Sequence, residues 1–133
     1  VCAYVSNVAW SPSPISPNDV VWAQPTDRHP AMRTALTLVP DDVSVTASYS
    51  LLPHLSHREQ IYDWPNPFIE AYWGNDDGYR LPDPSTIDYL VLDLQTVGND
   101  RRALVDQLTG PGGEYEVLFR QDDVLVARRP GAG

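Results

Sequence analysis

Residues 35–68 read ALTLVPDDVSVTASYSLLPHLSHREQIYDWPNPF, and this stretch decides the fold. Around its start, apolar side chains recur at the i, i+3, i+4 and i+7 spacing of one helix face, at Met32, Ala35, Leu36 and Val39. Asp27 can cap this helix and Pro40 ends it. The stretch therefore begins with a helix that offers one apolar face to a core.

An alternating segment follows this helix. Val43, Val45 and Ala47 are separated by the polar residues Ser44 and Thr46. A period of two with one apolar face is typical of a strand that is buried on one side only. The sequence therefore predicts a half-buried strand here.

A short helix and a second strand are predicted next. Ser48 or Ser50 can cap a helix through residues 54–57, in which Pro53 is tolerated near the first turn. Residues 60–64 then have the composition of a short strand.

The C-terminal half supplies the remaining elements. Residues 88–94, DYLVLDL, are nearly continuously apolar, which is typical of a strand buried on both faces. Residues 99–109 follow as a helix that Gly110 ends, and residues 115–119 and 124–128 indicate a hairpin. We therefore expect an α/β fold with a mixed, mostly parallel sheet, flanking helices and a C-terminal antiparallel hairpin.

Composition bounds the organisation and the function. The length of 133 residues suits one domain, which we place at residues 27–130, after a Pro- and Ser-rich extended lead-in or post-membrane linker at residues 1–26. Eighteen acidic residues against nine basic ones give a net charge of −9, which argues against binding nucleic acid. Cys2 is the only cysteine, so neither an internal disulfide nor a thiolate metal cluster can form. The chain has no recognisable cofactor motif, so we expect no cofactor.

Polar side chains follow two of the predicted strands. If the strands that end at Ala47 and Leu94 are parallel, the residues after them share one edge of the sheet, where ligands of open α/β sheets bind. This places five residues in a candidate binding edge: Tyr49, His54, His57, Arg58 and Asp93.

The roles of these side chains stay open. His54 and His57 lie three residues apart and would need a third ligand such as Asp93 to bind a metal, but the HxxH spacing is not a metalloprotease motif and we expect no metal site. Arg58 can clamp a phosphate or carboxylate, or pair with Asp63, Glu59 or a strand end.

A long connection over residues 65–84 carries aromatic side chains. Together with the residue before it, this segment gives a candidate aromatic surface of Trp64, Phe68, Tyr72 and Trp73. Such a mixture suits stacking on sugar rings and suits a protein–protein contact equally well.

Four runs resemble the C-terminal region of an uncharacterised family, a domain of unknown function, of bacterial multi-pass membrane proteins: VPDDVSVTASYSLLPHLSHREQIYDWPNPF, YWG, LPDPSTIDYLVLDL and YEVLFRQDDVLVARR. The N-terminal part of that family is similar to glycosyltransferases that use lipid-linked sugars. The resemblance covers residues 33–129, and its most specific signature is PHLSHR at residues 53–58 followed by the predicted strand and PNPF at residues 65–68. No known role is attached to PHLSHR.

This resemblance implies a soluble domain on the extracytoplasmic side, tethered to the membrane-embedded N-terminal part of the same protein. That part would be its partner, with a glycan or a lipid-linked sugar as a further one. We expect an accessory domain that is not catalytic on its own and that helps to recognise a glycan or an acceptor. The alternatives are a small metal- or His-dependent enzyme using His54, His57 and Asp93, and a protein–protein interaction module.

Overall fold

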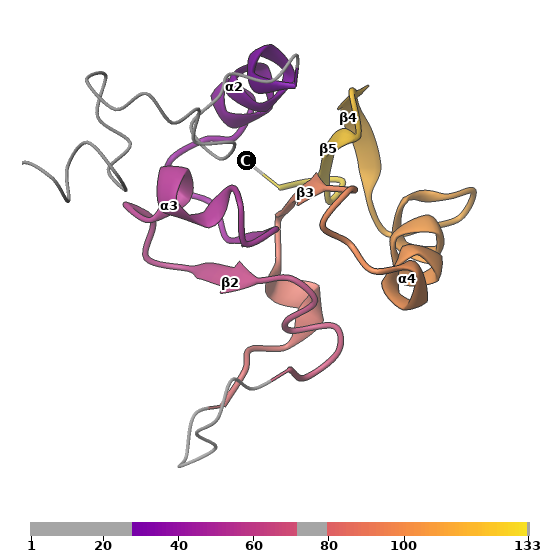
Figure 1. Cartoon of the computed structure of the whole chain (residues 1–133). Coiled ribbons are helices and arrows are strands. Elements are labelled where there is room, and N and C mark those ends of the chain that lie inside the picture. Colours follow the sequence, from indigo (N-terminus) through magenta and orange to yellow (C-terminus); the bar gives the residue numbers. More distant parts are fainter. Residues whose placement is uncertain (1–27, 72–79, 133) are drawn as a thin grey trace, which may run out of the picture.

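The computed structural model describes residues 28–71 and 80–132. Their elements, shown in Figure 1, are α2 (His29–Thr37), β1 (Val45–Ala47), α3 (Leu52–Leu55), β2 (Ile61–Asp63), the 3-10 helix η2 (Pro84–Thr86), β3 (Tyr89–Asp93), α4 (Asn99–Thr109), β4 (Glu116–Gln121) and β5 (Val124–Arg128). The five strands form one sheet in the order β2-β1-β3-β5-β4. β2, β1 and β3 are parallel, whereas β5 and β4 are antiparallel to their neighbours. The predicted mixed α/β sheet with a C-terminal hairpin is therefore confirmed.

The sheet separates two apolar clusters. Tyr89 and Val91 of β3 pack in the cluster that contains residues of α2 and α3, whereas Leu90 and Leu92 pack in the cluster that contains residues of α4. Successive side chains of a strand point to opposite faces, so one buried strand serves both layers. Figure 1 shows α2 and α3 together on one side and α4 on the other. The prediction that this strand is buried on both faces is confirmed.

The prediction of a half-buried first strand is wrong. All three residues of β1 are buried, and Ser44 just before it is buried as well. β1 lies inside the sheet between β2 and β3, and the segment after β2 covers its second face, where Thr46 Oγ1 donates to the Asn66 carbonyl at 2.9 Å. Alternation with Ser and Thr does not reveal burial when their hydroxyls find partners inside the protein.

Of the two predicted helix caps, the structure tests only the one at Ser48 or Ser50, and that prediction is wrong. Asp27 lies outside the described residues. α3 begins at Leu52 without a side-chain cap. The hydroxyls of Ser48 and Ser50 contact Asp93 instead: Ser48 Oγ accepts from the Asp93 backbone N–H at 2.9 Å, and Ser50 Oγ donates to the carboxylate at 3.2 Å. The two serines therefore join the end of β1 to the end of β3.

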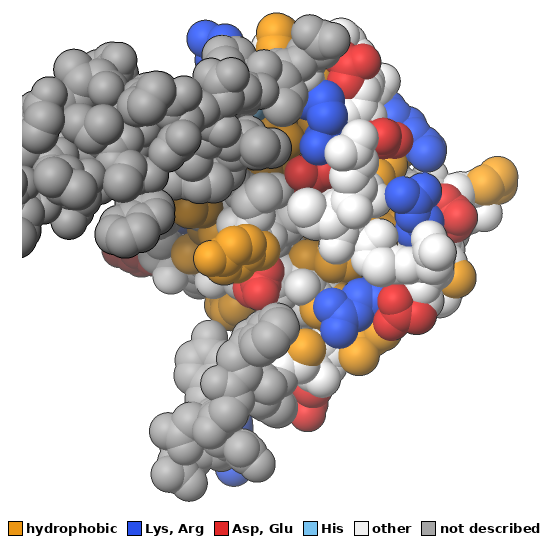
Figure 2. All heavy atoms as spheres, viewed as in Figure 1, with side chains coloured by type: hydrophobic (Ala, Val, Ile, Leu, Met, Phe, Trp, Pro, Cys, Tyr) orange, Lys and Arg blue, Asp and Glu red, His pale blue; other side chains and the backbone are white. Residues whose placement is uncertain are grey.

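Two further features concern the described residues as a whole. None of their helices combines the length and the apolar character that crossing a bilayer requires. On the face shown in Figure 2, acidic and basic side chains are interspersed, so charge alone does not mark a site on that face.

Candidate functional site at the amino edge of the sheet

The structure does not bring the five residues of the candidate binding edge together. Tyr49 and Asp93 lie at the carboxyl ends of β1 and β3, whereas His57 and Arg58 line a cavity formed by residues that precede the parallel strands. The reason is the connection between β1 and β2. Because these strands are parallel, the chain must return from the carboxyl edge to the amino edge before β2 starts, and His57 and Arg58 are on the returning segment.

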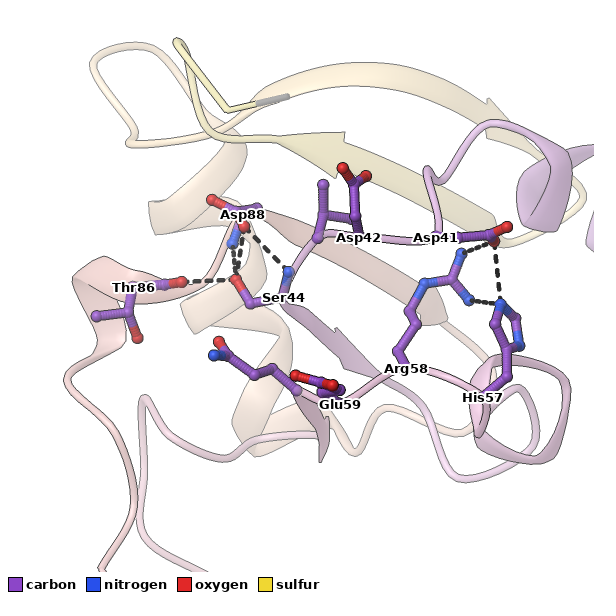
Figure 3. Close-up of a pocket in the computed structure, with 10 residues that line it drawn as sticks. Asp41, Asp42, Ser44, His57, Arg58, Glu59, Thr86 and Asp88 are labelled. Carbon is purple, nitrogen blue, oxygen red and sulfur yellow. Dashed lines mark hydrogen bonds and ion pairs between the residues drawn. The ribbon is translucent and has the colours of Figure 1, made fainter.

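This cavity, which we call the amino-edge pocket, has a volume of about 600 Å³. Figure 3 shows it between the segments that enter β1, β2 and β3. Its lining residues are Asp41, Asp42, Val43, Ser44, His57, Arg58, Glu59, Gln60, Thr86 and Asp88. Most of these side chains are polar and four are carboxylates, so the pocket presents mainly hydrogen-bond acceptors.

Arg58 forms one wall of the pocket and is only 6% exposed. Its Nη2 donates to the carbonyls of Val39 at 2.8 Å and Pro40 at 2.9 Å, and its Nε donates to Pro40 at 3.1 Å. Its acidic partner is not the predicted Asp63 or Glu59 but Asp41, which lies 3.4 Å from the guanidinium. Arg58 therefore holds the chain after α2 against the segment before β2.

His57 lies beside Arg58 and pairs with Asp41. Its Nε2 is 3.0 Å from Asp41 Oδ1 and 3.2 Å from Arg58 Nη1, and the side chain is 56% exposed (Figure 3). The hydrogen bond from His57 and the charge of its ring lower the pKa of Asp41. Nε2 can donate to the carboxylate or accept from the guanidinium, but not both at once. The proton on Nε2 therefore decides which of the two contacts is a hydrogen bond.

Ser44 and Asp88 form the opposite wall. Asp88 Oδ2 accepts from the Ser44 backbone N–H at 3.0 Å and lies 2.7 Å from its hydroxyl, which is also 2.6 Å from the Thr86 carbonyl. The same hydroxyl accepts from the Asp88 backbone N–H at 3.0 Å. These bonds join the entry of β1 to the entry of β3, so the Ser44 hydroxyl is committed to the fold.

Asp42 and Glu59 differ from the other carboxylates of the pocket. Both side chains are exposed, and Figure 3 draws no hydrogen bond or ion pair from either to the other residues shown. Gln60, next to Glu59, adds an exposed amide to the same lining. These three side chains have the capacity to bind a polar ligand without breaking the contacts that hold the pocket.

The carboxyl edge uses its buried carboxylate structurally. Asp93 is 2% exposed and forms an ion pair with Arg28. It also accepts from the backbone N–H of Gln95 at 3.1 Å. Arg28 also donates hydrogen bonds to the Gln95 side chain at 2.8 Å and to the Asp122 carbonyl in the hairpin turn at 3.1 Å. This network ties the start of α2 to β3 and to the hairpin.

The remaining predicted residues are distributed over the structure. Tyr49 is 80% exposed after β1, and His54 lines a second cavity beside α2. Among residues 28–71 and 80–132, no three His, Cys, Asp or Glu side chains are placed to hold a metal ion. His54, His57 and Asp93 therefore do not converge as the metal-dependent alternative requires.

The candidate aromatic surface is wrong for Trp64, which is buried, whereas Phe68 is partly exposed. Trp64 is 6% exposed and Phe68 packs against the same apolar cluster, with 5.9 Å between their ring centroids. Both rings cover the α4 side of the sheet, where burial of large apolar area outweighs exposure for stacking. Tyr72 and Trp73 lie outside the described residues.

No protein-family model matches the chain, and neither a curated protein nor a solved structure matches it. The family resemblance and the membrane tether that it implies therefore stay predictions. The chemistry of the site rests on the geometry of the described residues.

The sequence contained an unused signal for the amino-edge pocket. Once residues 43–47, 60–64 and 88–94 are predicted to be strands of a mostly parallel sheet, the polar residues before each of them must meet at one edge. Asp42 and Glu59 are in these positions. The predicted binding edge did not include Asp42 and Glu59, because it was built only from residues that follow the strands.

Proposed function

We propose that this chain is a non-catalytic accessory domain of a polytopic bacterial membrane protein, on the extracytoplasmic side, and that its amino-edge pocket holds a hydroxyl-rich glycan or acceptor. The membrane setting and the link to lipid-linked sugars rest on the resemblance of residues 33–129. The observation that supports the ligand class is the set of exposed polar side chains around the pocket, namely Asp42, Glu59 and Gln60.

The chemistry of these groups suits sugar hydroxyls. A carboxylate accepts hydrogen bonds only, and an amide both donates and accepts, so the three side chains together can satisfy a hydroxyl in either role. The volume of about 600 Å³ lies within the range of roughly 300–1,000 Å³ that is usual for small-molecule sites. The pocket therefore has room for one or two sugar units.

The non-catalytic assignment is supported by how the other polar groups are used. The Arg58 guanidinium, which could clamp a phosphate, donates to backbone carbonyls. The Ser44 hydroxyl, which could act as a nucleophile, bonds to Asp88 and Thr86. Both groups would have to leave structural partners before they could act on a substrate.

The proposal is tested by titrating the protein with neutral, amino and acidic oligosaccharides and following backbone amide shifts by NMR. We expect shifts around residues 41–44 and 58–60, and at least a fivefold loss of affinity in the double variant D42N/E59Q, which removes two charged acceptors without changing side-chain shape. The matched control is Asp100→Asn, an exposed carboxylate on α4. Binding that is equal in both variants, or absent at millimolar saccharide, would contradict the proposal.

A second candidate function has one specific observation in its favour. The ring of His57 contacts the Asp41 carboxylate at 3.0 Å and is half-exposed at the pocket, and a carboxylate partner that orients a histidine is one requirement of a general base. A screen of ester and phosphate-ester substrates separates this role from binding. Hydrolysis that is lost in His57→Asn and kept in His54→Asn would establish it, and the same rate in both variants would exclude it.

A further inference from the structure

A second cavity lies between α2 and the segment that leads from β1 into α3. It has a volume of about 490 Å³. Three of its lining side chains are apolar and three are basic: Met32, Leu36 and Leu51, and His29, Arg33 and His54. We call it the α2–α3 groove.

The charge of this groove is opposite to that of the protein. Its described lining residues include no carboxylate, although the chain has a net charge of −9 and the amino-edge pocket has four carboxylates. Ser50, which also lines the groove, reaches the buried Asp93, but Arg28 pairs with that carboxylate. An anion near Arg33 would therefore meet positive charge inside an otherwise repulsive field.

The apolar part of the groove calls for a different chemistry. Leu51 is buried, and Met32 and Leu36 are half-buried and pack against the core cluster. Covering them with an alkyl chain would remove additional apolar surface from water. Ser50 and Leu51 lie on the segment that leaves the carboxyl end of β1, so the groove lies at the carboxyl edge, where ligands of α/β sheets are usually bound.

We propose that the α2–α3 groove binds a single-chain amphiphile with a carboxylate head, with its alkyl chain over Met32 and Leu36 and its head at Arg33. The guanidinium matches a carboxylate in shape and charge. A volume of about 490 Å³ suits one small molecule rather than a protein helix. This site is separate from the amino-edge pocket, so the two proposals stand or fall independently.

The test uses the full chain and three probes with the same alkyl length: dodecanoate, dodecanol and dodecyltrimethylammonium, each below its micelle concentration. Calorimetry should rank dodecanoate tightest and the cationic probe weakest. Arg33→Gln should weaken dodecanoate binding by roughly three- to tenfold, whereas the control Arg101→Gln on α4 should leave it unchanged. Leu36→Trp, which fills the floor, should abolish binding, and Leu118→Trp on the exposed side of β4 is its control.

Three calorimetric outcomes would overturn the inference. They are no dodecanoate binding, a cationic probe that binds as tightly as the anionic one, and equal affinities in Arg33→Gln and Arg101→Gln. Binding to phosphatidylglycerol vesicles with no response to monomeric dodecanoate would assign the surface to a membrane and would also overturn it. Because Arg33 is exposed, its variant tests the idea even if Leu36→Trp does not fold.

Discussion

Replacing Arg58 by methionine tests the structural role on which the interpretation of the amino-edge pocket depends. The guanidinium makes three hydrogen bonds to two carbonyls, those of Val39 and Pro40, at 2.8–3.1 Å. A hydrogen bond to a charged group contributes about 1.5–3 kcal/mol. Leaving both carbonyls without their donor would therefore cost about 3–6 kcal/mol of unfolding free energy. Methionine packing and water entering from the open pocket offset part of this. We expect a net loss of about 2–4 kcal/mol.

The assay is urea unfolding followed by tryptophan fluorescence. The dependence of the unfolding free energy on urea concentration should be the same in wild type and variant, so that the change in midpoint reports stability. Arg58→Lys keeps the charge but has a single ammonium in place of the planar fork, so it should lose about half as much stability. Arg101→Met removes a partly exposed arginine that pairs with the exposed Asp100 carboxylate at 3.8 Å, and it should change stability by less than about 0.5 kcal/mol. A loss of unfolding free energy below about 1 kcal/mol in Arg58→Met would refute the structural role of Arg58. Its guanidinium would then be a candidate ligand-binding group again.

Three further predictions concern the core and two titrating groups. Leu92→Ala removes a fully buried side chain of β3 and should cost about 2–5 kcal/mol in urea melting; less than about 1 kcal/mol would contradict its central position. The pKa of Asp41 is lowered by His57, so its stabilisation is present above the unfolded pKa of 3.8 and is lost as pH falls through the folded value. Asp41→Asn should therefore flatten the acid limb of the stability–pH curve, and an unchanged limb would argue against the His57 contact. Burial raises the pKa of Tyr115 from 10.0 to about 12, so its stabilisation is present below pH 10 and lost as pH rises towards 12. An ultraviolet titration should show a late ionisation phase that is lost in Tyr115→Phe, and the absence of such a phase would contradict this prediction.

The fold could be predicted where a sequence period reports burial directly. The continuous apolar run of residues 89–92 favours a strand covered on both sides, and the structure places it inside the sheet. The hairpin was predictable because Asp122 and Asp123, both at positive φ in the structure, interrupt two strand-like runs. The burial of β1 was not predictable, because the carbonyl that receives the Thr46 hydroxyl comes from Asn66, twenty residues later.

The candidate site was harder to predict because it depends on the direction of the chain between elements. His57 and Arg58 are close in sequence to the end of β1, yet the return towards β2 carries them to the opposite edge. Asp93 stays at the carboxyl edge, where Arg28 reaches it from the start of α2. Residue types suggested that these groups cluster, and only the parallel pairing of the strands shows which of them meet.

Helix α2 connects the two edges physically. Its half-buried residues Met32 and Leu36 line the α2–α3 groove, and the chain immediately after it, at Val39 and Pro40, is held by Arg58 in the wall of the amino-edge pocket. The groove has a basic rim and the pocket is acidic, so the two cavities would select ligands of different charge. A ligand bound against α2 in the groove would therefore contact the helix that leads into the segment carrying Asp41 and Asp42. The two proposed ligands, an anionic amphiphile in the groove and a hydroxyl-rich molecule in the pocket, would therefore occupy opposite ends of the same parallel strands.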